Sequence, residues 1–576
     1  MTSDVPLAAV SASLPCQGWE TQAAWCLLHT GFDGGAHFLR TWAAWRADPQ
    51  RPSMLHYVAL ATQARDWSGL QFEFANDPAL QVLAQALYTQ CIGLTAGQHR
   101  LCFEGGHVLL TLCIGPRLSV LRQQQFEADR LVIAPVTVAD ELWEEWSVKA
   151  LVRCCRRGTR LAVRCGQPDV PQWLRQCGFE LADHAAPTAP RHGVFNPRWE
   201  LKTSREPWRH TRVAPQTCAV IGAGIAGASV AASLARRGWQ VQVFDQAGDP
   251  AAGASALPVG LAAPHVSVDD CVLSRLSRTG VRLSLQQAEM LLKVGQDWAP
   301  SGVCEHCFDD STAQPTPALW HNRAGWIKPA ALACAWLNDP NIRFQGDVTV
   351  HGLRHEEGGW TLLDAAGHEI ATVARVVLAN ATGALPLLQQ AQASQPTLAW
   401  GLHQLPAVYG VRGQVSWAVH DAPELRPFPA GPVNGSGSLI PFVPFEGEQR
   451  WFVGASYQPM GKPEWPDDKN HGANVLRLDK LLPELSAALA PVFEAGVLQA
   501  WKGVRCVTAD RLPMVGSVLQ GDPSLWICAG MGSRGLSFAP LCAELLAAQW
   551  AGEPLPIEVA LAQSLNARRQ RVDASN

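Results

Sequence analysis

The sequence predicts an α/β protein with two sheets in series: an N-terminal doubly wound sheet, then a GxGxxG dinucleotide-binding domain with an inserted, mainly antiparallel domain. Three observations support this prediction. Apolar strands alternate with helical segments over the first 200 residues. A strand, a glycine-rich turn, a helix and a second strand follow one another between Thr217 and Asp245. Residues 400–500 are richer in strand-like segments than the rest of the chain.

Length and composition limit the class of protein. With 576 residues the chain is too long for one core, which predicts two or three domains. The net charge is only −4, so any binding of nucleic acid would rely on local basic patches. The 17 cysteines lack zinc-ligand spacing, which predicts no metal site and a reducing compartment. Neither a secretory leader nor an apolar run of about eighteen residues is evident, so we expect a cytoplasmic protein without a membrane span.

Residues 1–200 form the first predicted domain. The segment Ala23–His29 reads as a helix or a strand, and it leads into a glycine-rich loop before a helix at Ala36–Arg46. A loop of this kind is where a nucleotide-like ligand would bind, with Gly31, Gly34 and Gly35 next to it. The remaining elements expected here are strands at Leu55–Leu60, Val108–Ile114, Leu131–Ala134 and Arg160–Arg164, and a helix at Glu141–Arg156.

Two basic stretches stand out near the end of this domain. The first, residues 153–164, contains no acidic residue, and the second, residues 191–212, is interleaved with Trp199 and Trp208. Such side chains would supply salt-dependent contacts to RNA phosphates, or they belong to a solvated basic linker at residues 201–216. The basic residues are Arg153, Arg156, Arg157, Arg160, Arg164, Arg191, Arg198, Lys202, Arg205, Arg209 and Arg212.

The second domain, residues 217–576, starts with the clearest motif of the chain. Cys218–Ile221 is a buried-strand pattern, and Gly222, Gly224 and Gly227 follow at GxGxxG spacing. These glycines permit a tight turn, the approach of a pyrophosphate and close packing of the helix at Ile225–Arg237. Asp245 ends the next strand, where its carboxylate can accept hydrogen bonds from a ribose, which argues against a 2′-phosphate but does not separate NAD from FAD.

Further elements complete the expected architecture. The apolar segment Val373–Ala379 is expected to return to the dinucleotide sheet, and the turn Gly532–Ser537 to open the last helix. A substrate domain is expected at about residues 400–500. The strands expected in this substrate domain are Gln414–Val419, Ser438–Val443 and Arg450–Tyr457. Outside it we expect a long helix at Leu273–Val294 and strands at Ile342–Phe344, Val348–Val350 and Trp360–Leu363.

The motifs from residue 217 to 560 resemble the D-amino acid oxidase/glycine oxidase group of FAD proteins. The resemblance lies in the GxGxxG turn, Gly253–Ser255, Val411–Gln414, Arg505–Gly516 and the late glycine-rich turn. It implies FAD as cofactor and Arg505 as the residue that holds the substrate carboxylate, with Arg412 and Arg534 as fallbacks. The implied cofactor-binding residues are Gly222, Gly224, Gly227, Asp245, Ser255, Val348, Gly532, Ser533, Arg534, Gly535 and Leu536.

More narrowly, the chain resembles a bifunctional family that makes 5-methylaminomethyl-2-thiouridine at the tRNA wobble position. This resemblance lies in Gly253–Ser255, Arg505–Gly516, and Gly532–Gly535 followed by Ala539–Leu541, and it also explains the order of the two domains. This resemblance implies a methyltransferase-like first domain that uses S-adenosylmethionine, and an FAD domain that oxidises a carboxymethylaminomethyl group. Three positions depart from the pattern: Asp33 in the glycine loop, Ala61 at the end of a strand, and Ala134 where the family has a catalytic Asp. We therefore expect the first domain to keep its fold with little or no methyl transfer.

Three functions stay open on the sequence. The first is an FAD oxidoreductase that acts on modified tRNA, which the basic stretches favour. The second is an FAD oxidase of free glycine-like secondary amines with a non-catalytic first domain. The third is a tRNA-binding protein without catalysis.

Overall fold

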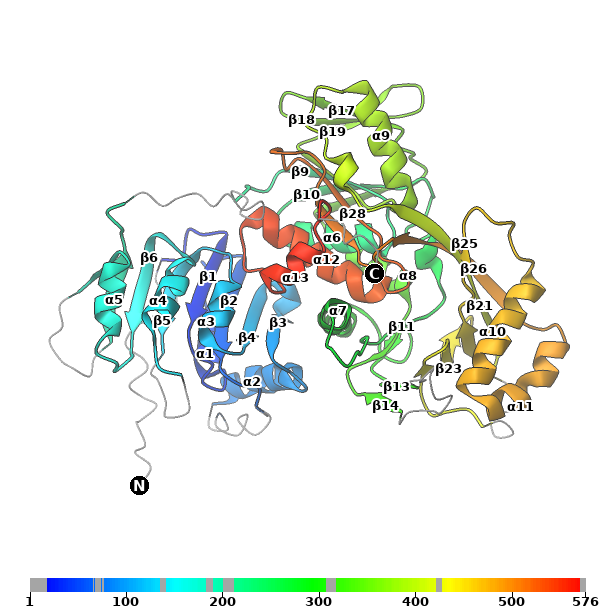
Figure 1. The fold of residues 1–576 in the computed structure, drawn as a ribbon, viewed down its shortest axis with the longest axis horizontal. Coiled ribbons are helices and arrows are strands. Elements are labelled where there is room, and N and C mark those ends of the chain that lie inside the picture. The colour runs from blue at the N-terminus through cyan, green and yellow to red at the C-terminus, as the bar shows by residue number, and fades with distance from the viewer. Residues whose placement is uncertain are drawn as a thin grey trace. The chain divides into compact units, whose positions relative to one another are not determined.

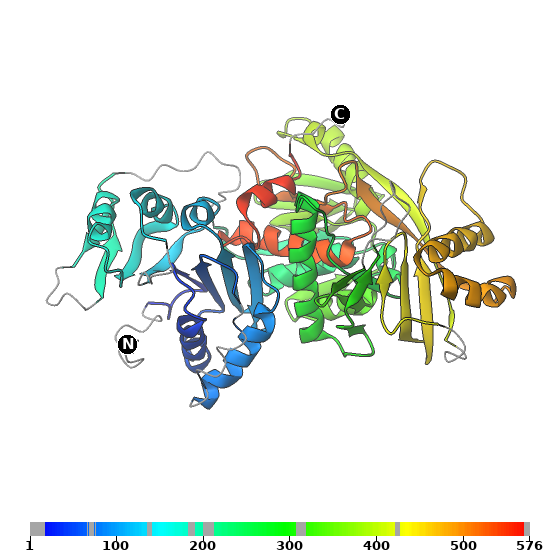
Figure 2. The same ribbon diagram turned by 60° about the horizontal axis from the view of Figure 1, so that its bottom comes forward.

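The computed structural model describes residues 18–65, 67, 74, 77–134, 141–182, 190–199, 212–306, 318–420 and 427–569. The described residues belong to two compact units, whose elements are labelled in Figure 1 and seen from another side in Figure 2. Unit 1 comprises Met1–Val213 with Ala548–Ala560, and unit 2 comprises Ala214–Ala547 with Leu561–Asn576. Within the described residues, no helix is long and apolar enough to cross a membrane, and no cluster of His, Cys, Asp and Glu is suited to a metal ion.

Unit 1 is built on a mixed sheet with a parallel centre. Its strands are β1 (Ala24–His29), β2 (Met54–Ala61), β3 (Gly97–Phe103), β4 (Val108–Ile114), β5 (Ala128–Ile133), β6 (Cys155–Val163), β7 (Phe179–Leu181) and β8 (Arg191–Phe195). They lie in the order β3-β4-β2-β1-β5-β6-β8-β7. From β1 the parallel strands β2 and β4 extend to one side and β5 and β6 to the other. The order thus reverses between β1 and β5, which confirms the predicted doubly wound sheet and places its ligand crevice there.

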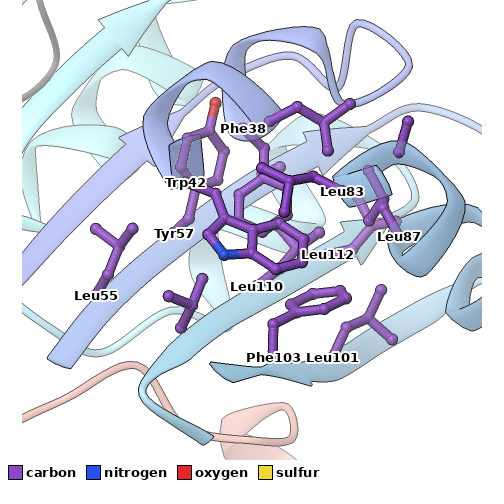
Figure 3. Packing of buried hydrophobic residues seen from close by; sticks show 14 of the residues in the cluster. Phe38, Trp42, Leu55, Tyr57, Leu83, Leu87, Leu101, Phe103, Leu110 and Leu112 are labelled. Carbon is purple, nitrogen blue, oxygen red and sulfur yellow. The ribbon is translucent and has the colours of Figure 1, made fainter. Parts of the chain in front are cut away.

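Helices cover both faces of this sheet, which is why its strands β1, β2 and β4 are almost continuously apolar. The helices α1 (Ala36–Ala47) and α2 (Pro78–Cys91) pack on one face. The helices α3 (Arg117–Arg122), α4 (Glu145–Val152) and α5 (Val170–Gln176) pack on the other. Figure 3 shows the first of these two cores, which includes Phe38, Trp42, Leu55, Tyr57, Leu83, Leu87, Leu101, Phe103, Leu110 and Leu112.

Unit 1 also contains a segment from the C-terminal part of the chain, Ala548–Ala560. The side chain of Gln98 donates a 2.6 Å hydrogen bond to the carbonyl of Leu555, and that of Arg100 donates to the carbonyl of Pro554. Buried Glu553 lies 3.3 Å from the imidazole of His56 on β2. The sequence-based prediction placed residues 548–560 in the second domain, residues 217–576, because a contact between residues 454 apart leaves no local pattern.

Unit 2 contains the dinucleotide-type sheet. Its strands are β9 (Thr217–Ile221), β10 (Gln240–Phe244), β16 (Ile342–Gln345), β20 (Arg375–Leu378), β27 (Met514–Ser517) and β28 (Leu525–Ala529). They lie in the order β16-β10-β9-β20-β28-β27, with β9 parallel to both β10 and β20. This pairing confirms that the segment around Val376 returns to the sheet. Every residue of α6 (Ile225–Ala235) is buried, so the helix needs no polar face.

A second sheet of unit 2 is mainly antiparallel, as expected for residues 400–500. Its strands are β13 (Val303–Glu305), β14 (Leu319–His321), β21 (Val408–Val419), β22 (Val433–Asn434), β23 (Ser438–Phe445), β24 (Glu448–Gly454), β25 (Gln458–Pro459) and β26 (Gln499–Thr508). The order is β14-β13-β22-β23-β24-β21-β25, and β26 also pairs with β21. The helices α10 (Asp467–Leu481) and α11 (Pro483–Glu494) pack their leucines on this sheet. Figure 1 labels the two helices beside strands of the sheet. The strands β13 and β14 lie outside the range expected from the sequence.

Several local expectations differ from the structure. The helix expected at Glu141–Arg156 is only α4, because the chain must turn so that Cys155 can pair with Ala128. The segment Val348–Val350 is not a strand; it follows β16, and the N–H of Val348 donates to the carbonyl of Asp245 at 2.9 Å. The segment expected as helix or strand is β1, and the turn at Gly532 opens α12 (Gly535–Ala551), which is followed by α13 (Val559–Ser564).

Candidate active site

A cavity of about 1040 Å³ lies within unit 2. Its walls include the turns after β9, β10 and β28 and residues of β23, β24 and β26, so the cavity lies between the six-stranded dinucleotide-type sheet and the eight-stranded, mainly antiparallel sheet. Of the residues predicted to bind the cofactor, those that line the cavity are Gly222, Gly224, Asp245, Ser255, Val348, Gly532, Ser533, Arg534, Gly535 and Leu536.

Two glycines of the first turn, Gly222 and Gly227, leave no room for a side chain. Gly222 has φ +103°, and a Cβ there would lie 2.7 Å from the carbonyl oxygen of Ala379. A Cβ at Gly227 would lie 1.8 Å from the carbonyl oxygen of Gly222, so this glycine allows α6 to approach β9 although it does not itself line the cavity. A Cβ at Gly224 would meet only the hydroxyl of Ser255, at 3.2 Å. The backbone at Gly224 is therefore open to the cavity, as a bound pyrophosphate requires.

Two polar side chains complete this end of the site. The carboxylate of Asp245 accepts hydrogen bonds from the N–H groups of Ala223 at 2.6 Å and Ala247 at 2.9 Å, one on each oxygen. Each oxygen keeps a further lone pair that can accept a ribose hydroxyl. The hydroxyl of Ser255 accepts the N–H of Ile225 at 2.9 Å, which leaves its own proton for a phosphate oxygen at the start of α6. These residues fit FAD.

Arg505 lies on β26 at the same cavity. Burial lowers the pKa of its guanidinium below the usual range, Tyr457 opposes this effect, and Arg477 adds to it. No carboxylate forms an ion pair with it among the residues that the structure describes. Gly413 on β21 makes room for it, since a Cβ there would lie 2.5 Å from the guanidinium. A partly buried cation that has no acidic partner among the described residues is suited to bind an anionic group of a substrate.

The two fallback arginines lie in different places. Arg412 does not line the cavity: its guanidinium lies 3.8 Å from Glu464 and donates to the carbonyl of Lys462 at 3.2 Å. Arg534 lines the cavity; burial lowers its pKa, and Glu305 opposes this. Glu305 also lines the cavity and lies 2.6 Å from the imidazole of His321. Arg534 thus has an acidic neighbour, whereas Arg505 has none among the described residues.

The crevice of unit 1 is the place where S-adenosylmethionine would have to bind. A Cβ at Gly31 would lie 2.8 Å from the Cβ of Ala134, so the methyl of Ala134 lies against the loop. Asp33 accepts the N–H of His37 at 3.2 Å, which places its carboxylate at the start of α1. Strand β2 ends in Ala61, which offers no carboxylate to a ribose. Gly34 and Gly35 have positive φ, but Gly35 lies against Leu87, where a Cβ would be 2.5 Å from the side chain. These residues do not fit the methyl donor.

A buried polar network lies next to this crevice. The hydroxyl of Tyr57 lies 3.0 Å from Nδ1 of His29 and 2.9 Å from Nδ1 of His37. One hydroxyl can donate to one neutral imidazole and accept from the other, so the network is satisfied without charge. Burial lowers the pKa of His37 from 6.5 to about 4, and it also lowers the pKa of His29.

The basic residues of unit 1 differ in their exposure. Arg156 is paired with buried Asp129, so it is partly structural. Arg157 is exposed and donates to the carbonyl of Trp199 at 2.8 Å. Arg153 and Arg198 are also exposed. Lys202, Arg205 and Arg209 lie outside the described residues.

Some residues of the cavity were not predicted. Glu305, Tyr457 and Arg477 all line it, although they come from β13, the segment before β25 and α10. None of them belongs to a motif, and their common location depends on the pairing of strands that are distant in sequence. The sequence indicated only that a substrate domain rich in strands lies at about residues 400–500, not which of its residues line the cavity.

The chain is similar in sequence to known proteins over nearly its whole length. The model of the family described as FAD dependent oxidoreductase matches residues 217–317 and 310–549. The tRNA 5-methylaminomethyl-2-thiouridine biosynthesis bifunctional protein MnmC of Albidiferax ferrireducens is 53% identical, over 98% of this chain and 96% of that protein. The protein of the same name from Polaromonas naphthalenivorans is 44% identical, over 95% and 90% respectively. Among solved structures, the glycine oxidase of Geobacillus kaustophilus is 19% identical, covers 62% of this chain and 100% of its own, and has a TM-score of 0.49.

Proposed function

The chain belongs to the MnmC family of bifunctional proteins, and residues 217–549 belong to the FAD dependent oxidoreductase family; from this we propose that it acts on the wobble uridine of tRNA. The reaction is the oxidative removal of the carboxymethyl group from 5-carboxymethylaminomethyl-(2-thio)uridine. One observation carries the proposal: the partly buried guanidinium of Arg505, which has no acidic partner among the described residues, shares a cavity with the dinucleotide turn.

The residues present would divide the work as follows. Gly224, Ser255 and Asp245 would hold the pyrophosphate and ribose of FAD. FAD, when bound, supplies the hydride acceptor for the CH₂ group beside the substrate nitrogen. Arg505 binds the substrate carboxylate through paired charge-assisted hydrogen bonds and so fixes that CH₂ group in place. Water then hydrolyses the C=N bond, which leaves an aminomethyl group on the uridine and releases a two-carbon aldehyde acid.

Methyl transfer by unit 1 is a separate question. The relatives are named bifunctional, and unit 1 has the doubly wound sheet of a methyltransferase. Because Asp33, Ala61 and Ala134 do not fit the donor, we derive no methylation step and propose that unit 1 contributes little or none.

Oxidation of a free glycine-like amine is the second candidate, since Arg505 would bind the carboxylate of a small amino acid equally well.

One experiment separates the two candidates. The FAD-loaded chain is mixed, in the absence of oxygen, with an anticodon stem-loop RNA that carries carboxymethylaminomethyluridine. We expect the oxidised-flavin absorption to disappear and mass spectrometry to detect aminomethyluridine. An RNA with plain uridine is the control. Reduction by N-methylglycine but not by the RNA would establish the second candidate instead, and failure to take up FAD would leave only RNA binding.

A further inference from the structure

The cavity has an aromatic side chain at its edge that the proposed reaction does not use. Tyr457 lines the cavity, yet 48% of it is exposed. The chain has only 4 tyrosines, and two of them, Tyr57 and Tyr88, are buried in unit 1. We propose that the Tyr457 ring is the platform on which the uracil of the substrate nucleotide stacks while its side chain enters the cavity. This inference rests on the proposed function and specifies how the RNA is recognised.

The pairing of strands places Tyr457 beside Arg505. Arg412 pairs with Gln458, and the N–H of Gln414 donates to the hydroxyl of Ser456 at 2.9 Å. Tyr457 lies between these two contacts in the chain, and so close to Gly413, the residue whose missing side chain leaves room for the Arg505 guanidinium. Tyr457 and Arg505 both line the cavity, and Tyr457 is near enough to affect the pKa of Arg505.

The length of the substrate side chain requires the base to be near this position. From C5 of uracil to the carboxylate carbon the side chain crosses four single bonds, which span roughly 5 Å when extended. The hydrogen bond to the guanidinium adds about 2.8 Å. When Arg505 holds the carboxylate, the uracil ring is thus within roughly 8 Å of the guanidinium. Tyr457 is a neighbour of Arg505 that is both aromatic and half-exposed.

The surroundings favour stacking over binding of the backbone phosphates. Lys502 lies 2.5 Å from Asp467 and 3.5 Å from Glu464, and Glu464 also lies near Arg412, so these two cations already have acidic neighbours. Arg477 lies at the cavity instead and donates to the carbonyl of Ser436 at 2.6 Å. Proteins that select single-stranded RNA bases hold them on exposed aromatic rings. An unpaired wobble base of an anticodon loop is such a base, whereas a free amine has no ring to stack.

The test compares two variants at this position with a matched control. Tyr457→Ala removes the ring, and Tyr457→Phe keeps the ring without the hydroxyl. Tyr409→Ala is the control, because Tyr409 is 41% exposed on the same sheet but does not line the cavity. Each FAD-loaded variant is assayed with the modified stem-loop RNA and with N-methylglycine. Binding is measured separately by fluorescence anisotropy, using a stem-loop whose side-chain NH is replaced by oxygen so that no oxidation occurs.

We expect Tyr457→Ala to weaken RNA binding and raise KM for the RNA by about 5- to 100-fold, the range found for loss of one base–aromatic stack. Tyr457→Phe should stay within about twofold of the parent chain, as should Tyr409→Ala. If the Phe variant loses as much as the Ala variant, or oxidation of N-methylglycine falls as far as that of the RNA, the hydroxyl holds the carboxylate and stacking is refuted. If the parent chain binds FAD but leaves the RNA unchanged, the proposed function itself fails.

Discussion

Replacing Arg505 with alanine tests the central assignment. Its guanidinium lies in the cavity, and burial lowers its pKa because the charged form is poorly solvated there. No carboxylate of the described residues compensates for that cost in the free enzyme. The substrate carboxylate would be the missing partner. The variant should therefore lose catalysis without losing stability.

The expected loss follows from the type of contact. Truncating one partner of a buried, hydrogen-bonded charge pair costs about 2–5 kcal/mol. At about 1.4 kcal/mol per factor of ten, kcat/KM for the modified RNA should fall about 30- to 5,000-fold. The melting temperature should stay level or rise, because an unpaired buried charge has been removed. Flavin content should not change, since the dinucleotide turn lies on other residues of the cavity.

Steady-state oxidation of the stem-loop RNA, flavin absorption and thermal unfolding measure these quantities. Arg505→Lys keeps the charge but cannot form the bidentate pair, so it should recover only part of the loss. Arg412→Ala is the matched control, because this arginine lies on the same pair of strands but not at the cavity. A normal kcat/KM in Arg505→Ala would show that another group, with Arg534 first among them, holds the carboxylate.

Four further outcomes are expected. Gly224→Val should abolish FAD binding, because even a Cβ meets the Ser255 hydroxyl at 3.2 Å; retained flavin absorption would contradict this. RNA binding should weaken steeply with salt, and the Arg157→Glu, Arg198→Glu pair should reduce the slope of affinity against salt; a flat response would favour the free-amine oxidase. Burial lowers the pKa of His37 from 6.5 to about 4, so its contribution to the free energy of unfolding is complete above pH 6.5, and about 3 kcal/mol of that free energy is lost as pH falls towards 4. In urea unfolding at a series of pH values, His37→Gln should reduce this loss of stability on the acid side. Calorimetry with S-adenosylmethionine should detect no micromolar binding, and methylated product would show that unit 1 is active.

The sequence by itself determined the features that depend on local pattern. The GxGxxG spacing with Asp245 identified a dinucleotide site, because the tight turn and the helix packing each require glycine at fixed positions. The resemblance at Arg505–Gly516 indicated Arg505, one of the arginines that line the cavity. Alternating apolar segments predicted both α/β sheets and the antiparallel insertion.

Only the tertiary structure decided which side chains share a site. It separated Arg412 from the cavity and placed Glu305, Tyr457 and Arg477 at its wall. It also assigned Ala548–Ala560 to unit 1. These relations arise from strand pairing and buried polar contacts between residues far apart in the chain, and such contacts leave no periodicity or motif in the sequence from which they could be read.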